Sequence, residues 1–203
     1  MRWFDVKWFA GRRAILLPVY GAAIGAIGAA VYLKSPKALP NSAAAFLAAA
    51  LWTALALLPR EQTTRVNVIA IGAAFAVRWL AIDHLATGAV LPIFVAAQTV
   101  PRAAMIVLAW MSRPAPSGSG YAFSSTLNTW IALIAMAMGI AAAFACGLRP
   151  AAMILAGAYL IGRLVQWISY RVRGGLNAES LGVTQLSIEL YVLLIFDCAT
   201  CRW

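Results

Sequence analysis

The stretch Gly174-Gly175-Leu176-Asn177-Ala178-Glu179-Ser180-Leu181-Gly182 joins two long apolar runs and continues into a segment that carries Glu189. The glycine pair breaks the chain, and Asn177 or Ser180 can cap the helix that follows. Glu179 falls in or beside the first turn of that helix, where the helix dipole favours a carboxylate. The stretch therefore predicts a tight turn between two membrane-spanning helices.

The composition extends this prediction to the whole chain. Hydrophobic residues make up 64% of the 203 residues and charged residues only 11%, whereas a soluble domain is about half apolar and about a quarter charged. Continuous apolar runs approach the roughly 20 residues that a helix needs to cross a bilayer. Seven of them lie at 14–33, 43–59, 66–82, 89–111, 126–147, 150–169 and 181–198. We expect an all-α polytopic bundle of about seven transmembrane helices, in a single membrane domain spanning 1–203.

The net charge of +10 follows from basic residues that lie mostly between the apolar runs. The positive-inside rule explains this distribution better than nucleic-acid binding does. With the N-terminus inside, ten basic residues lie on that side: Arg2, Lys7, Arg12, Arg13, Arg60, Arg65, Arg113, Arg163, Arg171 and Arg173. Lys34, Lys37, Arg149 and Arg202 lie on the other side, and Arg78 and Arg102 fall within runs. We therefore predict an inside N-terminus, an outside C-terminus and no nucleic-acid partner.

Two interpretations fit the polar residues at the inner face. Arg113, Arg171 and Arg173 lie in loops on that side, which topology alone explains, but clustered arginines also suit a phosphorylated substrate. Glu179 likewise serves as the acidic residue of a helix N-terminus, or as a surface carboxylate that binds Mg²⁺ beside a phosphate. The residues by themselves leave both questions open.

Glu189 lies ten residues beyond Glu179, roughly 15 Å further along the helix and near the bilayer midplane. An ionised carboxylate at that depth needs a partner. Gln185 lies one turn above it on the same face, and Arg102 lies at comparable depth just after Pro101. We therefore expect Glu189 and Gln185 to be buried polar residues, with Glu189 and Arg102 forming an ion pair inside the bundle.

The pattern Gly174-Gly175-x-Asn177-x-Glu179-x-Leu181-Gly182, followed by Glu189, resembles the C-terminal signature of the cobalamin synthase family (adenosylcobinamide-GDP ribazoletransferase). Leu17-Pro18-Val19-Tyr20-Gly21 is similar to the first membrane helix of that family, and Val100-Pro101-Arg102 to its Ser-Arg helix. The family's aspartate-rich segment after the second membrane helix has no counterpart between Leu57 and Val66. The chain is therefore identified as a reduced member that lacks this segment.

The resemblance implies a magnesium-dependent phosphoryl-group transferase of the last steps of cobalamin biosynthesis. It would join α-ribazole, or its 5′-phosphate, to adenosylcobinamide-GDP with release of GMP, in the bacterial cytoplasmic (inner) membrane. Glu179 and Asn177 would be the catalytic residues, and Glu179 and Glu61 would hold Mg²⁺. The implied substrate- and phosphate-binding residues are Arg102, Arg113, Arg171, Arg173, Gly174 and Gly175.

Two alternatives stay open. A non-catalytic relative would bind a corrinoid or nucleotide intermediate or a partner enzyme of the pathway, which the missing aspartates favour. A small-molecule transporter would use the buried charged residues as a gate. Membrane lipid is the expected surroundings in every case, and a homo-oligomer is compatible with each. Cys198 and Cys201 have a redox or metal-ligand spacing with no second pair, so their state is not determined by the sequence.

Overall fold

The computed structural model describes residues 11–34, 41–57, 65–83, 85, 89–115, 124 and 126–197. A short 3-10 helix, η1 (Gly11–Ile15), leads into α1 (Leu16–Lys34), and six further named α-helices follow in the described part of the chain. They are α2 (Asn41–Leu57), α3 (Arg65–Asp83), α4 (Val90–Met111), α6 (Thr129–Phe144), α7 (Leu148–Arg173) and α8 (Ala178–Asp197). The predicted all-α bundle is confirmed, and each helix coincides with one of the apolar runs.

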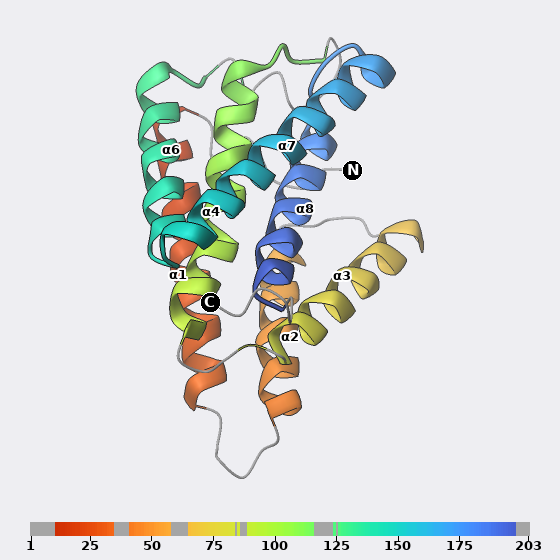
Figure 1. Ribbon diagram of the computed structural model, residues 1–203. Helices are drawn as coiled ribbons and strands as arrows, with labels where there is room; N and C mark the ends of the chain where they lie inside the picture. Colours follow the sequence, from red (N-terminus) through yellow and green to blue (C-terminus); the bar gives the residue numbers. More distant parts are fainter. Residues whose placement is uncertain are drawn as a thin grey trace.

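Among the described residues, four helices are long and apolar enough to cross a membrane: Arg13–Lys34, Val90–Met111, Leu148–Arg173 and Ala178–Phe196. Ser42–Ala54 and Thr129–Phe144 are apolar but shorter. The chain is a multi-pass membrane protein, while the count of seven spans stays a prediction. The 26 residues of α7 extend about 39 Å, more than the roughly 30 Å of hydrocarbon. This excess length is consistent with the oblique course of α7 across α4 and α8 (Figure 1).

The helix α4 forms the centre of the bundle and packs against α1, α6, α7 and α8. Fifteen of its 22 residues are buried, including Gln98 and Arg102, and it stays helical through Pro101. By contrast, α7 buries only eight of 26 residues, which places it at the periphery. In Figure 1, α1 and α6 lie on one side of α4, and α8 and α3 lie on the other, while α2 packs against α1 and α3. Residues on α4 and α8 are therefore the ones best shielded from lipid.

The helices α1 and α4 approach each other closely at glycines on one face of α1. A Cβ at Gly25 would lie 2.5 Å from the carbonyl oxygen of Phe94, and a Cβ at Gly21 would meet the backbone of Gln98. Nearby, the indole Nε1 of Trp52 in α2 donates a hydrogen bond to the carbonyl oxygen of Ile24 (3.3 Å). Small residues permit this backbone approach, and the resulting contact fixes α1 against α4.

Candidate functional site

Two connecting segments meet at the end of the bundle where α4 and α7 finish and α8 begins (Figure 1). The backbone N–H of Ala115 donates to the carbonyl oxygen of Leu176 (2.9 Å), and the N–H of Leu176 donates to that of Arg113 (3.0 Å). These bonds form a short parallel bridge between Pro114 and Leu176. The bridge brings Arg113, which follows α4, next to the Gly174-Gly175 turn, which follows α7.

Both glycines of the turn are required by its geometry. Gly174 ends α7 in the left-handed conformation (φ 70°), and its N–H donates to the carbonyl oxygen of Tyr170 (3.2 Å). A Cβ at Gly175 would lie 2.7 Å from the backbone nitrogen of Ala115 and 2.7 Å from the carbonyl carbon of Pro114. Only glycine lets the two segments approach to hydrogen-bonding distance. The predicted turn is confirmed, and it has a second function in the pairing of the two segments.

Asn177 is the residue that caps α8. Its Oδ1 accepts hydrogen bonds from the backbone N–H of Ser180 (2.9 Å) and from the Ser180 hydroxyl (2.8 Å). The Ser169 hydroxyl of α7 donates to the same Ser180 oxygen (2.7 Å). Leu176 and Leu181, on either side of the cap, are buried in an apolar cluster that includes Ile106 of α4. The start of α8 is thus held by both polar and apolar contacts.

Glu179, in the first turn of α8, forms an ion pair with Arg173 at the end of α7. Both side chains are partly exposed, and the described residues contain no group of three or more His, Cys, Asp or Glu side chains able to hold a metal ion. Magnesium prefers several oxygen ligands, so one carboxylate already paired with an arginine does not fit a resident Mg²⁺. Glu61, the second proposed ligand, lies outside the described residues.

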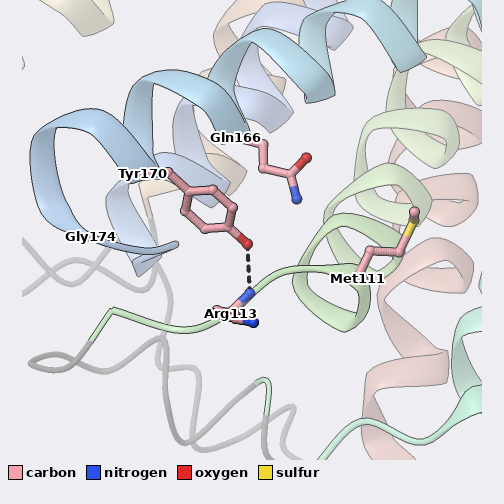
Figure 2. A pocket seen from close by; sticks show the side chains of 5 residues that line it. All are labelled: Met111, Arg113, Gln166, Tyr170 and Gly174. Atoms are coloured by element: carbon pink, nitrogen blue, oxygen red, sulfur yellow. Dashed lines mark hydrogen bonds between the residues drawn. The ribbon is translucent and has the colours of Figure 1, made fainter.

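A recess of about 380 Å³ opens beside this turn and is lined by Met111, Arg113, Gln166, Tyr170 and Gly174 (Figure 2). The backbone N–H of Arg113 donates to the phenolic oxygen of Tyr170 (2.7 Å). Arg163 Nη1 donates to Gln166 Oε1 (2.6 Å), and Gln166 Nε2 donates to the hydroxyl of Ser112 (2.8 Å). These bonds tie α7 to the chain that leaves α4 and fix the polar side chains around the recess.

The predicted phosphate-binding arginines do not converge on a single point. Arg113 lines the recess, while Arg173 is paired with Glu179. Arg171 is exposed and stacks over the Trp167 ring, 5.4 Å from its centroid. Arg102 is 4% exposed inside the bundle, nine residues and roughly 13 Å before the end of α4. The structure therefore brings Arg113 and the Gly174-Gly175 turn together and separates Arg102 from them.

Glu189 is buried as predicted, but the expected partner was wrong. Arg78 of α3 holds Glu189 in a two-pronged ion pair, Nε to Oε1 at 2.6 Å and Nη2 to Oε2 at 3.0 Å. Arg78 is 5% exposed and Glu189 is 2% exposed. Gln98 Nε2 donates a further hydrogen bond to Glu189 Oε1 (2.9 Å). Arg78 Nη1 also donates to the hydroxyl of Thr53 in α2 (3.2 Å). The pair therefore links α2, α3, α4 and α8.

Arg102 reaches this cluster only through Gln98. Its Nη1 donates to the backbone carbonyl oxygen and to the side-chain Oε1 of Gln98, both at 2.6 Å. Its Nε is buried without a hydrogen-bond partner among the described residues, and its guanidinium lies 6.0 Å from the centroid of the Tyr20 ring. Gln185, expected beside Glu189, is only partly buried. The amide that binds Glu189 is that of Gln98.

Sequence reasoning missed several residues of these clusters, and the most central of them are Arg78, Gln98, Gln166 and Tyr170. Arg78 carried the same signal as Arg102, an ionisable residue inside an apolar run. The position of each arginine along its helix could not show whether Arg78 or Arg102 pairs with Glu189, because α3 is inclined in the bundle (Figure 1). Gln166 and Tyr170 lie four residues apart on one face of α7. The sequence shows this spacing but not the residues that these two side chains contact.

A model of the family described as cobalamin-5-phosphate synthase matches residues 65–197, more than half of the chain. The matched segment contains all the residues of the recess, the Gly174-Gly175 turn, and both Glu179 and Glu189. No curated protein and no solved structure matches the chain.

Proposed function

This chain belongs to the cobalamin-5-phosphate synthase family, and from that premise we propose that it is a membrane transferase of cobalamin biosynthesis. The proposed reaction joins α-ribazole, or its 5′-phosphate, to adenosylcobinamide-GDP and releases GMP. The observation that carries the proposal is the family match over 65–197, because it contains the whole recess and the turn beside it.

In the proposed reaction, a hydroxyl oxygen of the α-ribazole forms a bond to the phosphorus that carries the corrinoid. The bond from that phosphorus to the GMP oxygen breaks, its electron pair leaves with GMP, and the proton of the attacking hydroxyl passes to water. Such phosphoryl transfer depends mainly on positioning the reactants and on neutralising phosphate charge. Arg113, in the recess, and Arg173, beside the turn, are the cations proposed to meet the diphosphate, with the backbone of Gly174 and Gly175 close to it.

The other residues have supporting proposed functions. Arg171 is exposed at the same end of α7 and adds positive charge that attracts an anionic substrate. Asn177 uses Oδ1 to cap α8, which leaves its amide N–H groups to orient the substrate. Glu179 requires a change of partner before it can act on a substrate or a metal ion, because Arg173 now binds it. Magnesium dependence stays a prediction, to be decided by titration.

Orientation and location complete the proposal. The ten-to-four distribution of basic residues supports an inside N-terminus in the bacterial inner membrane. The recess then faces the cytoplasm, where nucleotide substrates are made. Corrinoid and nucleotide are the proposed substrates, and a second copy of the chain or a pathway enzyme is the proposed source of further acidic groups.

The test is turnover by purified protein in liposomes, with adenosylcobinamide-GDP and α-ribazole and with Mg²⁺ varied. We expect Arg113→Gln to lower turnover at least tenfold, because a charged hydrogen bond to phosphate is lost. Arg149→Gln, an exposed arginine at the opposite end of α7, is the matched control and should leave turnover unchanged. Glu179→Gln tests the proposed catalytic carboxylate. Absence of product from folded protein under all magnesium concentrations would refute the transferase.

One observation favours the second candidate, a non-catalytic relative that binds a corrinoid or nucleotide intermediate. Glu179 is paired with Arg173, and the described residues hold no metal-binding cluster. Magnesium-independent substrate binding without turnover would establish this alternative. Turnover that disappears in Glu179→Gln would exclude it.

A further inference from the structure

The exposed face of α7 carries two parallel rows of side chains near the end where α8 begins. The first row is charged and aromatic, and its spacing of four residues keeps it on one side of the helix. Its exposed members are Arg163, Trp167 and Arg171. The adjacent row is apolar and 45–72% exposed, and it consists of Leu160, Leu164, Ile168 and Val172. A row of arginine and tryptophan beside a row of aliphatic side chains is typical of a helix surface at a membrane interface.

The two arginines of the first row extend toward each other along the helix. Arg163 Nη1 donates to Oε1 of Gln166, which lies further along α7 (2.6 Å). The guanidinium of Arg171 lies over the ring of Trp167, which precedes it, 5.4 Å from the ring centroid. The Cα atoms of the two arginines are about 12 Å apart along the helix axis, but both guanidinium groups are held at the turn that contains Gln166 and Trp167. Each guanidinium keeps further N–H donors beyond these contacts.

The length of α7 between its exposed arginines requires a lipid headgroup close to Arg163. Arg149 lies at the start of α7, and the helix between Arg149 and Arg163 extends about 21 Å. The hydrocarbon layer is roughly 30 Å thick, and the oblique course of α7 shortens the depth that this segment spans (Figure 1). A charged side chain on a lipid-facing surface is stable only where it reaches the headgroup region. Arg163, whose side chain bonds toward the end of α7, therefore lies where a phospholipid phosphate must approach it.

We propose that this face of α7 binds an anionic phospholipid, with the guanidinium groups of Arg163 and Arg171 donating to its headgroup oxygens and the apolar row packing against its acyl chains. In the part of the chain that the structure describes, the carboxylates that form ion pairs bind Arg78 and Arg173 rather than these two arginines. A zwitterionic headgroup would bring a cationic choline or amine to the same place, so the arginines select an anionic lipid. The inference concerns lipid alone and does not depend on the proposed reaction.

Lipid binding to the full chain in mild detergent tests the proposal, with bound lipids counted by native mass spectrometry. An arginine near a membrane surface contributes about fivefold to the affinity for an anionic lipid, so phosphatidylglycerol should bind about 25-fold more tightly than phosphatidylcholine of the same acyl chains. Arg163→Gln and Arg171→Gln should each reduce this preference about fivefold, and the double variant should abolish it. Both side chains are exposed, so the variants should fold, which circular dichroism checks.

Arg149→Gln is the matched control, because it removes an exposed arginine from the opposite end of α7 and should leave the lipid preference unchanged. Equal affinity for the two lipids would overturn the proposal. A loss in Arg149→Gln as large as that in Arg163→Gln would also overturn it, because net charge alone would then explain the binding.

Two further outcomes identify a different occupant of this face. Soluble glycerol 3-phosphate has a phosphate ester without acyl chains, so it should not displace phosphatidylglycerol at millimolar concentration. Displacement would assign the two arginines to a soluble anion. A dimer that forms in place of lipid binding, and that disappears in Arg163→Gln, would assign the face to a second copy of the chain. Either result would overturn the proposal.

Discussion

Replacing Glu189 by Gln tests how the interior of the bundle is stabilised. The substitution keeps the size and shape of the side chain but removes the charge that faces Arg78 Nε at 2.6 Å and Nη2 at 3.0 Å. The amide nitrogen of glutamine would also face guanidinium or Gln98 donors. Both charged residues are nearly inaccessible to solvent, 2% and 5% exposed. Removing one partner of such a buried pair costs about 3–5 kcal/mol, because the other charge stays buried and unpaired.

A double-mutant cycle identifies the partner of Glu189. Arg78→Met removes the uncompensated charge that Glu189→Gln leaves, so the double variant should recover about 2–3 kcal/mol relative to the sum of the single costs. Arg102 contacts Glu189 only through Gln98. A second cycle, with Arg102→Met in place of Arg78→Met, should therefore give a coupling energy below about 1 kcal/mol.

The assay is reversible unfolding in mixed micelles, followed by circular dichroism as the fraction of SDS rises. Glu179→Gln is the matched control, since it makes the same chemical change in the partly exposed pair with Arg173. Its cost should lie below about 1 kcal/mol, as for surface ion pairs. The reasoning would be wrong if Glu189→Gln cost no more than this control. It would be equally wrong if Arg102 coupled to Glu189 more strongly than Arg78 does.

Two further predictions concern the turn at the site and the opposite end of the bundle. Gly175→Ala should destabilise the protein by about 1–3 kcal/mol in the same assay, because the new methyl group would meet the backbone of Ala115. Gly162→Ala, inside α7, places its methyl group more than 4 Å from every other described residue that it could meet, so it should be neutral or stabilising. Burial raises the pKa of the Cys146 thiol, in the turn between α6 and α7, from 9.0 to about 11. Maleimide labelling at pH 8, with Cys198 and Cys201 replaced by Ser, should thus be roughly 100-fold slower than after unfolding. Because the pKa of this thiol is higher in the folded than in the unfolded protein, its contribution to stability should fall as pH rises from about 9 to about 11. Equal labelling rates in the folded and the unfolded protein would contradict the burial of Cys146.

The helices of this protein could be predicted from hydropathy because a membrane span must bury nearly all its side chains in lipid or protein. The run at 150–169 was the least complete of these predictions. It stopped before Tyr170, while α7 continues to Arg173. The charged residues that ended the run, Arg171 and Arg173, are exposed at the end of an oblique helix. Hydropathy measures transfer into lipid, so it does not detect a helical turn that extends beyond it.

The candidate site was predicted in its local parts and missed in its assembly. A glycine pair followed by Asn177 predicts a turn and a cap, because both depend on residues within a few positions of one another. The hydrogen bond from Arg113 to Tyr170 joins residues 57 positions apart. The bond from Gln166 to Ser112 joins residues 54 positions apart. Nothing in the spacing of a single sequence specifies such contacts.

The sequence by itself determined that the chain is a helical membrane protein, which segments form its apolar helices, that Glu189 must be buried, and which residues form the turn before α8. Each of these follows from interactions between neighbouring residues or from the free energy of transferring one residue out of water. Only the tertiary structure decided that Arg78 rather than Arg102 neutralises Glu189, and that Arg113 and Tyr170 meet at one recess. Two arginines inside apolar runs cost nearly the same to bury, so the choice between them depends on the inclination and contacts of the helices that carry them.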